Sequence, residues 1–212
     1  MFIYIDVEQG SSDWHQHRCG SLGASQVHEV LAKTKSGYSA ARGNAIARIV
    51  SEKLTGVVQE TYKNAAMQWG NDTEPQARSA YSFFTGNPVS VVGMFKHPTM
   101  AGTHASPDGL VNDDGLIEIK CPNTLTHIET LDSEKIDPKY ITQMQWQMFL
   151  TGRDWCDFVS FDPRMPDDLQ LFIKRVRRDP QHISELCDEV SKFLGEVDEM
   201  MVRIDKIRAK RA

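Results

Sequence analysis

The alternation of apolar and polar positions divides the chain into segments with helical or extended periodicity. A repeat of three to four residues predicts an amphipathic helix, and a repeat of two predicts a strand with one buried face. Helices are therefore expected over residues 39–56, 71–86 and 137–152, with two shorter ones within 11–37 that are split at Gly20–Gly23. Strands are expected over residues 1–7, 89–98, 104–111, 115–121, 155–163 and 169–179.

Residues with strong positional preferences mark the ends of several of these segments. Asp72 or Thr73 would cap the helix over 71–86, with Pro75 in its first turn. Asp114-Gly115, between two strand-like runs, predicts the turn of a β-hairpin. Three helices are each expected to end at a glycine: Gly56, Gly86 and Gly152.

The last segment carries an apolar stripe with alternating spacings of four and three residues. The stripe consists of Leu186, Val190, Phe193, Val197, Met200, Ile204 and Ile207. Such a stripe predicts one long amphipathic helix. Packing of this helix on its own domain is favoured over an intermolecular coiled coil. The basic tail KIRAKRA suits a helix C-terminus or contact with phosphate.

The order of the elements predicts the fold class. Helices come first, then a run of strands, one helix, two more strands and the long helix. This order is typical of an α/β (α+β) fold in which a central mixed, mainly antiparallel sheet is flanked by helices. The 212 residues are expected to form one domain over 1–212.

Composition adds limits on the class of protein. Hydrophobic residues make up 40% and charged residues 25%, as in ordinary globular proteins, and no apolar run is long enough to span a bilayer. The N-terminal stretch MFIYIDVEQG lacks the features of a secretory signal, so a cytoplasmic protein is expected. The net charge of −5 argues against a nonspecific nucleic-acid coat, but not against a DNA enzyme whose carboxylates hold metal ions.

The stretch GLIEIKCP combines an apolar strand with two charges. Glu118 and Lys120 lie two positions apart and therefore share one face, while Ile117 and Ile119 share the other. The predicted hairpin brings Asp108 close to Glu118. Two such carboxylates with the backbone carbonyl of Ile119 suit Mg²⁺, and a neighbouring amine suits phosphodiester hydrolysis. By itself, however, this short pattern is more often a solvated strand face.

The wider arrangement resembles a known nuclease family. SPDG followed by GLIEIKCP resembles the core of the PD-(D/E)xK superfamily, and more narrowly the phage lambda exonuclease family of alkaline exonucleases and YqaJ-type viral recombinases. Four further stretches resemble that family in the same order: VEQGSSDWHQHRCGSLGASQV, AMQWGNDTEPQAR, YITQMQWQMFLTG and FDPRM.

The resemblance implies roles for particular residues. The implied metal ligands are Asp108, Glu118 and Ile119, the last through its carbonyl, for Mg²⁺ with Mn²⁺ as a substitute. The implied catalytic residues are Asp108, Glu118, Lys120, Glu74, Gln143 and Gln145. The two glutamines lie on nearly opposite helix faces, so only one is expected to point at the site. The alternatives are a helix-terminal carboxylate for Glu74 and polar helix surface for the glutamines.

The family also binds the 5′-phosphate of the strand that it digests. By position this role is implied for Arg18, Ser25 and Ser106, while Met67 matches an apolar wedge that splits the duplex end. A surface ion pair for Arg18, a helix N-cap for Ser25 and a core position for Met67 are the alternatives. The chain has Thr126 where some members have a basic residue, so its phosphate pocket is either weaker or rebuilt, from Lys135, Lys139 or the run KRVRR.

The resemblance implies a Mg²⁺-dependent exonuclease that degrades one strand of double-stranded DNA ends from 5′ to 3′ and releases mononucleotides. It further implies a ring-shaped homotrimer that leaves 3′ single-stranded tails and works with a single-strand annealing protein of a phage or prophage in a bacterial host. The alternatives are a PD-(D/E)xK endonuclease, a Cas4-like nuclease or a catalytically inactive DNA-binding subunit. Four scattered cysteines, without the clustered spacing of an iron–sulfur site, count against the Cas4-like alternative.

Overall fold

The computed structural model describes residues 2–59 and 65–211. Its helices are α1 (Ser12–Arg18), α2 (Val27–Leu31), α3 (Ala40–Thr55), α4 (Ala65–Thr85), α5 (Thr124–Ser133), α6 (Pro138–Thr151) and α7 (Pro180–Ala209), with short 3-10 helices at Ala24–Gln26 and Asp167–Leu169. Its strands are β1 (Ile3–Ile5), β2 (Leu22–Gly23), β3 (Lys33–Thr34), β4 (Gly37–Tyr38), β5 (Val89–Ser90), β6 (Met94–Lys96), β7 (Thr103–His104), β8 (Gly109–Val111), β9 (Gly115–Lys120), β10 (Trp155–Phe161) and β11 (Leu171–Arg177).

The main sheet has five strands in the order β11-β10-β9-β8-β5. Strands β9 and β10 pair in parallel, whereas the other three pairs are antiparallel. The parallel pair is possible because α5 and α6 carry the chain back along the sheet between the two strands. The expected mixed, mainly antiparallel sheet flanked by helices is therefore confirmed.

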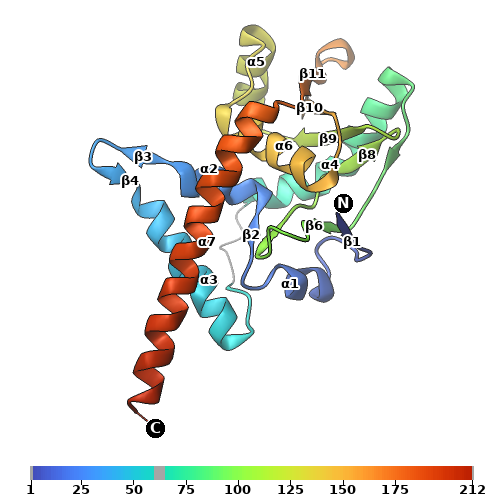
Figure 1. The fold of residues 1–212 in the computed structure, drawn as a ribbon. Helices are drawn as coiled ribbons and strands as arrows, with labels where there is room; N and C mark the ends of the chain where they lie inside the picture. Colours follow the sequence, from blue (N-terminus) through green and yellow to red (C-terminus); the bar gives the residue numbers. More distant parts are fainter. Residues whose placement is uncertain (1, 60–64, 212) are drawn as a thin grey trace.

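Helices cover both faces of this sheet (Figure 1). On one face, Ala77 and Tyr81 of α4 pack against a cluster that includes Ile117 and Ile119 of β9. On the other face, α6 contributes Met144 and Met148, which pack with Leu116, Cys156 and Phe158. The period of two in β9 is thus confirmed, and α6 buries the strand face that carries Glu118.

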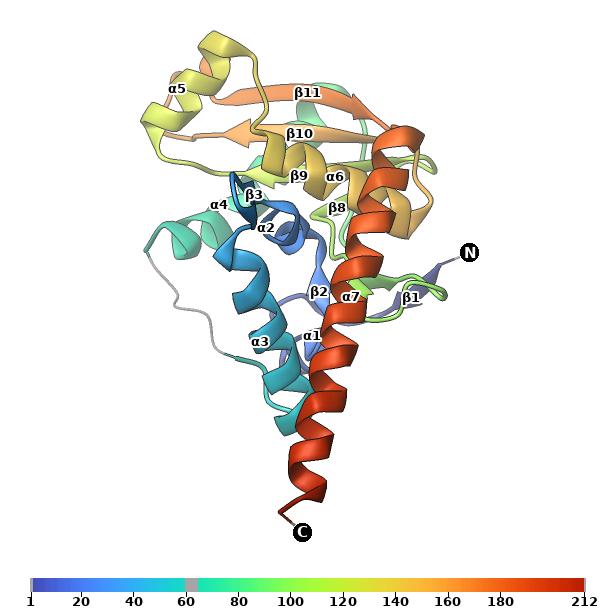
Figure 2. The same ribbon diagram turned by 60° about the vertical axis from the view of Figure 1, so that its left-hand side comes forward.

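A third cluster joins the N-terminal helices to α7. Leu186, Val190, Phe193 and Val197 of α7 are buried against residues of α2 and α3. Figure 2 shows α7 running beside α3 toward the C-terminus. Met200 and Ile204 are partly buried against the same cluster, so six of the seven residues of the predicted stripe pack within the chain, whereas Ile207 near the end of the helix is exposed.

Several predicted boundaries are wrong. Helix α4 begins at Ala65 rather than near Asp72, so Pro75 lies inside the helix and not in its first turn. The strand expected over 89–98 is divided into β5 and β6, which belong to different sheets. Gly93 lies between them, where a Cβ atom would come within 2.4 Å of the Ile5 carbonyl oxygen.

The strand expected over 104–111 is divided as well, into β7 and β8. The β8–β9 hairpin is present, but its left-handed turn residue is Asn112, with φ 49°. Gly115 belongs to β9 instead, and a Cβ atom there would lie 2.1 Å from the Trp155 ring. A glycine is therefore needed at this position for close packing against Trp155 and not to form the turn.

Helix α5 and the β3–β4 hairpin were not predicted. Helix α5 begins after Asn123, whose side chain accepts a hydrogen bond from the backbone N–H of Thr126. The β3–β4 hairpin follows α2. Among the described residues, no helix combines the length and the apolar character that a membrane span requires.

Candidate active site

The hairpin brings Asp108 and Glu118 to the same end of the sheet. Gly109 pairs with Ile117, so Asp108 comes opposite the next position of β9. The backbone N–H of Ile119 donates a hydrogen bond to Asp108 Oδ2 over 2.6 Å. Burial, together with the charges of Glu118 and Glu74, raises the pKa of Asp108 well above its usual value.

Glu118 is almost completely buried and accepts hydrogen bonds at both carboxylate oxygens. Gln143 Nε2 donates to Oε1 and Gln147 Nε2 donates to Oε2, each over 2.7 Å. Both glutamines project from α6 at a spacing of four residues, which places them on one helix face. The carboxylate is therefore held in one orientation on β9, the middle strand of the sheet.

Lys120 ends β9 beside this carboxylate. Its Nζ lies 2.5 Å from Glu118 Oε1 and 4.9 Å from the centroid of the Tyr140 ring. Burial lowers the pKa of Lys120, but the charges of Glu118 and Asp108 outweigh that effect and raise it above its usual value. The amine is therefore a cation in this arrangement.

Glu74 lies near the edge of the group on α4. Burial raises the pKa of Glu74, while the charge of the neighbouring Arg78 opposes that rise. Arg78 forms an ion pair with Glu74 and donates from Nε to the Asp108 carbonyl over 3.2 Å. Within residues 2–59 and 65–211, no group of three or more His, Cys, Asp or Glu side chains is arranged to hold a metal. The candidate ligands are thus the predicted pair of carboxylates and the Ile119 carbonyl.

Gln145 lies away from the carboxylates, unlike the predicted catalytic Gln143. Its side chain donates to the Arg177 carbonyl over 2.8 Å and accepts from the backbone N–H of Asp179 over 2.9 Å. It therefore joins the end of β11 to the start of α7. The residue that completes the contact with Glu118 is Gln147, which we did not predict, although its spacing of four from Gln143 was visible in the sequence.

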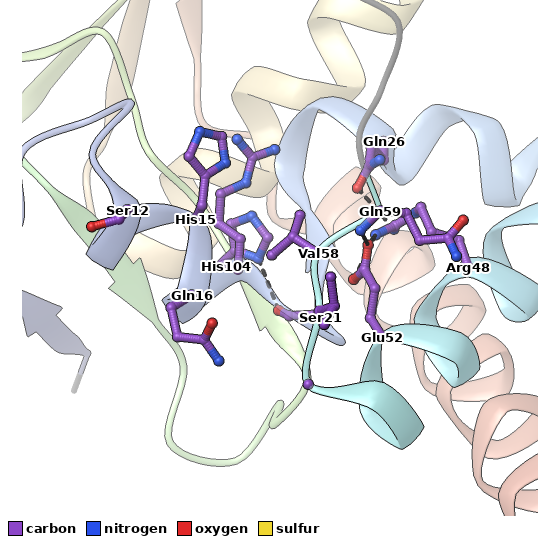
Figure 3. Close-up of a pocket in the computed structure, with 13 residues that line it drawn as sticks. Ser12, His15, Gln16, Ser21, Gln26, Arg48, Glu52, Val58, Gln59 and His104 are labelled. Carbon is purple, nitrogen blue, oxygen red and sulfur yellow. Dashed lines mark hydrogen bonds and ion pairs between the residues drawn. The ribbon is translucent and has the colours of Figure 1, made fainter.

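Arg18 lines a cleft of about 980 Å³ between α1, α3 and β7. Figure 3 shows other residues of its lining, among them His15, Glu52 and His104. The guanidinium carbon of Arg18 lies 4.0 Å from the centroid of the Trp14 ring. No residue in the described part of the chain forms a hydrogen bond or ion pair with this guanidinium. Burial and the nearby charge of Arg48 lower the pKa of Arg18. A largely buried guanidinium with its donors available is suited to binding an anion.

A short chain of contacts joins this cleft to the carboxylates. Trp14 Nε1 donates to Ser106 Oγ over 2.9 Å, and Ser106 precedes Asp108 by two residues. Ser25 does not join this group, because it is exposed on the 3-10 helix and is not among the residues that line the cleft. Its predicted N-cap role is also wrong, since Gly23 and Gln26 cap the two consecutive helices there.

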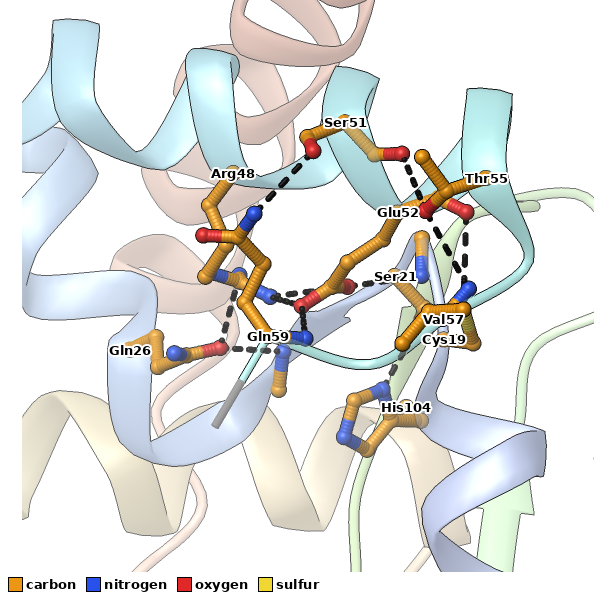
Figure 4. Close-up of polar contacts among 12 residues, drawn as sticks. Cys19, Ser21, Gln26, Arg48, Ser51, Glu52, Thr55, Val57, Gln59 and His104 are labelled. Carbon is orange, nitrogen blue, oxygen red and sulfur yellow. Dashed lines mark hydrogen bonds and ion pairs between the residues drawn. The ribbon is translucent and has the colours of Figure 1, made fainter. Parts of the chain in front are cut away.

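Glu52 is a buried carboxylate on the wall of the same cleft (Figure 4). It accepts hydrogen bonds from the backbone N–H groups of Gly20 (2.8 Å) and Gln59 (3.2 Å). Arg48 Nη1 lies 3.1 Å from both of its oxygens. Glu52 therefore attaches the segment that follows Arg18 to α3.

Ser21 and His104 form a second attachment of that segment, with Ser21 Oγ and His104 Nδ1 2.8 Å apart (Figure 3). Burial, followed by the charges of Arg18, Lys96 and Arg48, lowers the pKa of His104 well below its usual value, so the ring is neutral.

The chain has Thr126 where some family members have a basic residue. Most of the basic residues that could take the place of that residue in a phosphate pocket form contacts with other groups. Lys139 pairs with Asp137, Arg175 with Asp157, and Lys174 donates to the Glu134 carbonyl. The second guanidinium that lines the cleft is Arg48. Sequence reasoning missed it because Arg48 lies outside the quoted motifs, in the stretch between residues 27 and 66.

Met67, the predicted wedge, lies near the start of α4 with 48% of its surface exposed. The alternative of a core position is therefore wrong.

Comparisons with known proteins agree with this architecture. An alkaline exonuclease (LHK-Exo) from Laribacter hongkongensis is 49% identical, and its crystal structure matches with a TM-score of 0.88 over 95% of this chain and 100% of that one. The structure of LHK-Exo in complex with dAMP matches with 48% identity and a TM-score of 0.89 over the same shares. A phage-related exonuclease from Haemophilus somnus, 18% identical, shares the fold with a TM-score of 0.72 over 87% of this chain and 96% of that one.

An uncharacterized protein of Acanthamoeba polyphaga mimivirus is 27% identical over 180 residues. These cover 79% of this chain but 31% of the mimivirus protein, so the chain spans about a third of that relative. The model of the YqaJ-like viral recombinase domain matches residues 13–154, more than half of the 212 residues. The chain, which has the fold of an alkaline exonuclease, therefore belongs to the YqaJ-like viral recombinase family.

Proposed function

We propose that the chain is a Mg²⁺-dependent exonuclease that digests one strand of double-stranded DNA from its 5′ end and leaves a 3′ single-stranded tail. The observation that carries the proposal is the hydrogen bond from Ile119 to Asp108, which holds Asp108 opposite Glu118 and next to Lys120. This combination of two carboxylates and an amine at the ends of adjacent strands suits phosphodiester hydrolysis.

The residues fit a divalent metal ion. The charges of Glu118 and Glu74 help to raise the pKa of Asp108, which means that these carboxylates repel one another. A cation held by Asp108, Glu118 and the Ile119 carbonyl would relieve that repulsion, and oxygen ligands suit Mg²⁺ or its substitute Mn²⁺. When bound, the ion supplies positive charge that polarises the phosphodiester and the attacking water.

The chain's own residues account for orientation and charge. Gln143 and Gln147 hold the Glu118 carboxylate, so its ligand geometry is fixed before substrate arrives. The Lys120 ammonium lies beside it and donates hydrogen bonds to the oxygens on which negative charge develops.

The Arg18 cleft supports the 5′-to-3′ polarity. A terminal phosphate carries more negative charge than an internal one, and a guanidinium with free donors binds it selectively. The cleft is joined to Asp108 through Trp14 and Ser106, so a bound end would have a fixed relation to the carboxylates.

The similar enzymes favour an exonuclease over an endonuclease or a Cas4-like nuclease. LHK-Exo is an alkaline exonuclease, and one of its structures is a complex with dAMP, a mononucleotide. The four cysteines are scattered along the sequence and lack the clustered spacing of an iron–sulfur site. An inactive subunit is disfavoured because Asp108, Glu118 and Lys120 are all present and adjacent. A ring-shaped homotrimer, a single-strand annealing partner and a bacterial host cytoplasm complete the proposal.

The test compares a linear duplex labelled at one 5′ end with a closed circle, both incubated with Mg²⁺. We expect labelled mononucleotide from the linear DNA and none from the circle. Cutting of the circle would favour an endonuclease, and the absence of any release from linear DNA would overturn the proposed function.

A further inference from the structure

The last turns of α7 carry a cluster of positive charge in a chain whose net charge is −5. The basic end of α7 consists of Lys206, Arg208, Lys210 and Arg211, within the tail KIRAKRA. All four residues are exposed. Lys206 and Lys210 lie four residues apart and share one side of the helix, whereas Arg208 lies on nearly the opposite side. Positive charge therefore faces more than one direction around the helix end.

The chain's own carboxylates leave these cations unpaired. Among residues 2–59 and 65–211, no ion pair includes any of the four, although Asp205 is their neighbour in the sequence. The helix dipole favours cations in the last turn, where Lys206 and Arg208 lie. That effect uses none of their hydrogen-bond donors, so the donors remain available to an external anion.

The basic end follows the part of α7 that packs beside one wall of the Arg18 cleft. Ile204 packs against the same apolar cluster as Leu54 of α3. Glu52 and Gly56, on either side of Leu54 in the sequence, line the cleft. Beyond this cluster α7 continues past the end of α3 (Figure 2). The charge is therefore carried on a projecting helix end next to that wall.

The spacing of the charges suits a polyanion. Lys206, Arg208 and Lys210 lie within roughly 6 Å along the helix axis. Duplex DNA carries about one negative charge per 1.7 Å of its axis, so the two charge spacings are comparable. An acidic protein fits less well, because protein interfaces have an apolar centre, and Ile207 is the exposed large apolar side chain among residues 206–211.

We propose that the basic end of α7 is a further nucleic-acid contact, outside the candidate active site, and that it binds the phosphate backbone without reading sequence. The inference rests on the proposed function, which supplies DNA as the polyanion. Contacts to phosphate carry no sequence information, which suits an enzyme that digests DNA of any sequence. Such a contact holds DNA on the protein when no 5′ end occupies the Arg18 cleft.

The experiment measures the Kd for two circular DNAs, one double-stranded and one single-stranded, at several salt concentrations in EDTA. A circle has no 5′ end for the Arg18 cleft, and EDTA removes the metal ion that the proposed cleavage requires. Each neutralised phosphate contributes about 0.9 to the slope of log Kd against log salt concentration on a duplex, and about 0.7 on a single strand. In Lys206→Gln/Lys210→Gln we therefore expect the slope to fall by about 1.8 on the duplex circle or by about 1.4 on the single-stranded circle. The circle that shows the fall identifies the form of DNA that is bound.

Lys174→Gln/Lys192→Gln is the matched control. It removes the same charge from two exposed lysines whose amines contact the Glu134 carbonyl and the Glu189 carboxylate. We expect it to keep the wild-type slope on both circles. Glutamine and lysine have similar helix propensities, and thermal melting identifies any variant that fails to fold.

An unchanged slope on both circles in Lys206→Gln/Lys210→Gln would overturn the inference and favour an acidic protein as the partner of this surface. An equal fall in the control would also overturn it, because the effect would then come from net charge alone. Digestion of linear duplex DNA with Mg²⁺ tests the proposed function separately, since a failure there leaves the slopes in EDTA unaffected.

Discussion

The side chain of Asp108 accepts a hydrogen bond from the backbone N–H of Ile119 in β9 over 2.6 Å. This bond joins the strand that carries Glu118 and Lys120 to the SPDG segment. Because Trp14 also donates a hydrogen bond to Ser106 of that segment, the carboxylates and the Arg18 cleft are connected through the SPDG segment.

Asp108→Asn should abolish cleavage while leaving the fold intact. The amide keeps the size of the side chain but removes the charge that a metal ligand needs. Loss of a residue that only hydrogen-bonds to a metal ligand lowers activity by up to about a hundredfold, so loss of the ligand itself should lower the rate by more than that. Release of labelled nucleotide measures it. Asp113→Asn, in the exposed hairpin turn, is the control, and near-normal activity of Asp108→Asn would show that the site is misassigned.

Gln147→Leu should lower activity more than Gln145→Leu. Loss of the Gln147 bond frees one oxygen of Glu118, so the Mg²⁺ concentration for half-maximal rate should rise by about ten- to a hundredfold. Gln145→Leu should instead lower the free energy of unfolding by about 1–3 kcal/mol, because the backbone groups of Arg177 and Asp179 lose their partner. Metal titration and urea unfolding distinguish the two effects, and the reverse ranking would contradict the structure.

Arg18→Gln should remove the preference for a phosphorylated 5′ end. A hydrogen bond to a charged group contributes about 1.5–3 kcal/mol, so the ratio of rates on phosphorylated and hydroxyl ends should fall by roughly tenfold or more. Competition between the two ends in one reaction measures the ratio. Arg203→Gln, far along α7, should leave it unchanged. A preference that survives in Arg18→Gln would exclude the cleft as the phosphate site.

Glu52→Ala should destabilise the protein strongly. The change leaves the buried N–H of Gly20 and Nη1 of Arg48 without their acceptor, and loss of one partner of a buried pair costs about 3–5 kcal/mol. Urea unfolding measures the loss. Glu199→Ala is the control because that carboxylate is 73% exposed, and its loss should cost less than about 1 kcal/mol. Equal effects of the two changes would contradict the role assigned to Glu52.

Asp162 should make stability depend on acidic pH. Burial alone would raise the pKa of Asp162, but hydrogen bonds from Arg164 and Thr124 lower it from 3.8 to about 2. A carboxyl with a lowered pKa in the folded state stabilises the fold above its unfolded pKa, and that contribution is lost as the pH falls from about 4 through about 2. The difference in unfolding free energy between the wild type and Asp162→Asn should therefore shrink over that range. A difference that stays constant would argue against the lowered pKa.

The sequence by itself determined the features that depend on local periodicity. Period-two alternation assigned Ile117 and Ile119 to one face of β9 and Glu118 and Lys120 to the other. The 3.6-residue repeat located α3, α6 and α7, because helix faces and glycine ends are properties of a short stretch. The order of the motifs also indicated the family.

Only the tertiary structure decided which distant groups meet. Pro75 suggested a helix start, yet α4 begins ten residues earlier at Ala65, and Trp69 in this part of the helix contacts Arg164. Gly115 resembled a turn residue, yet its lack of a side chain makes room for Trp155. The choice of Gln147 over Gln145, and the contact of Glu52 with Gly20, likewise depend on how α6 and α3 pack. A hydrogen bond requires its atoms to lie within a few tenths of an ångström, and periodicity along the chain does not specify the position of one element against another to that accuracy.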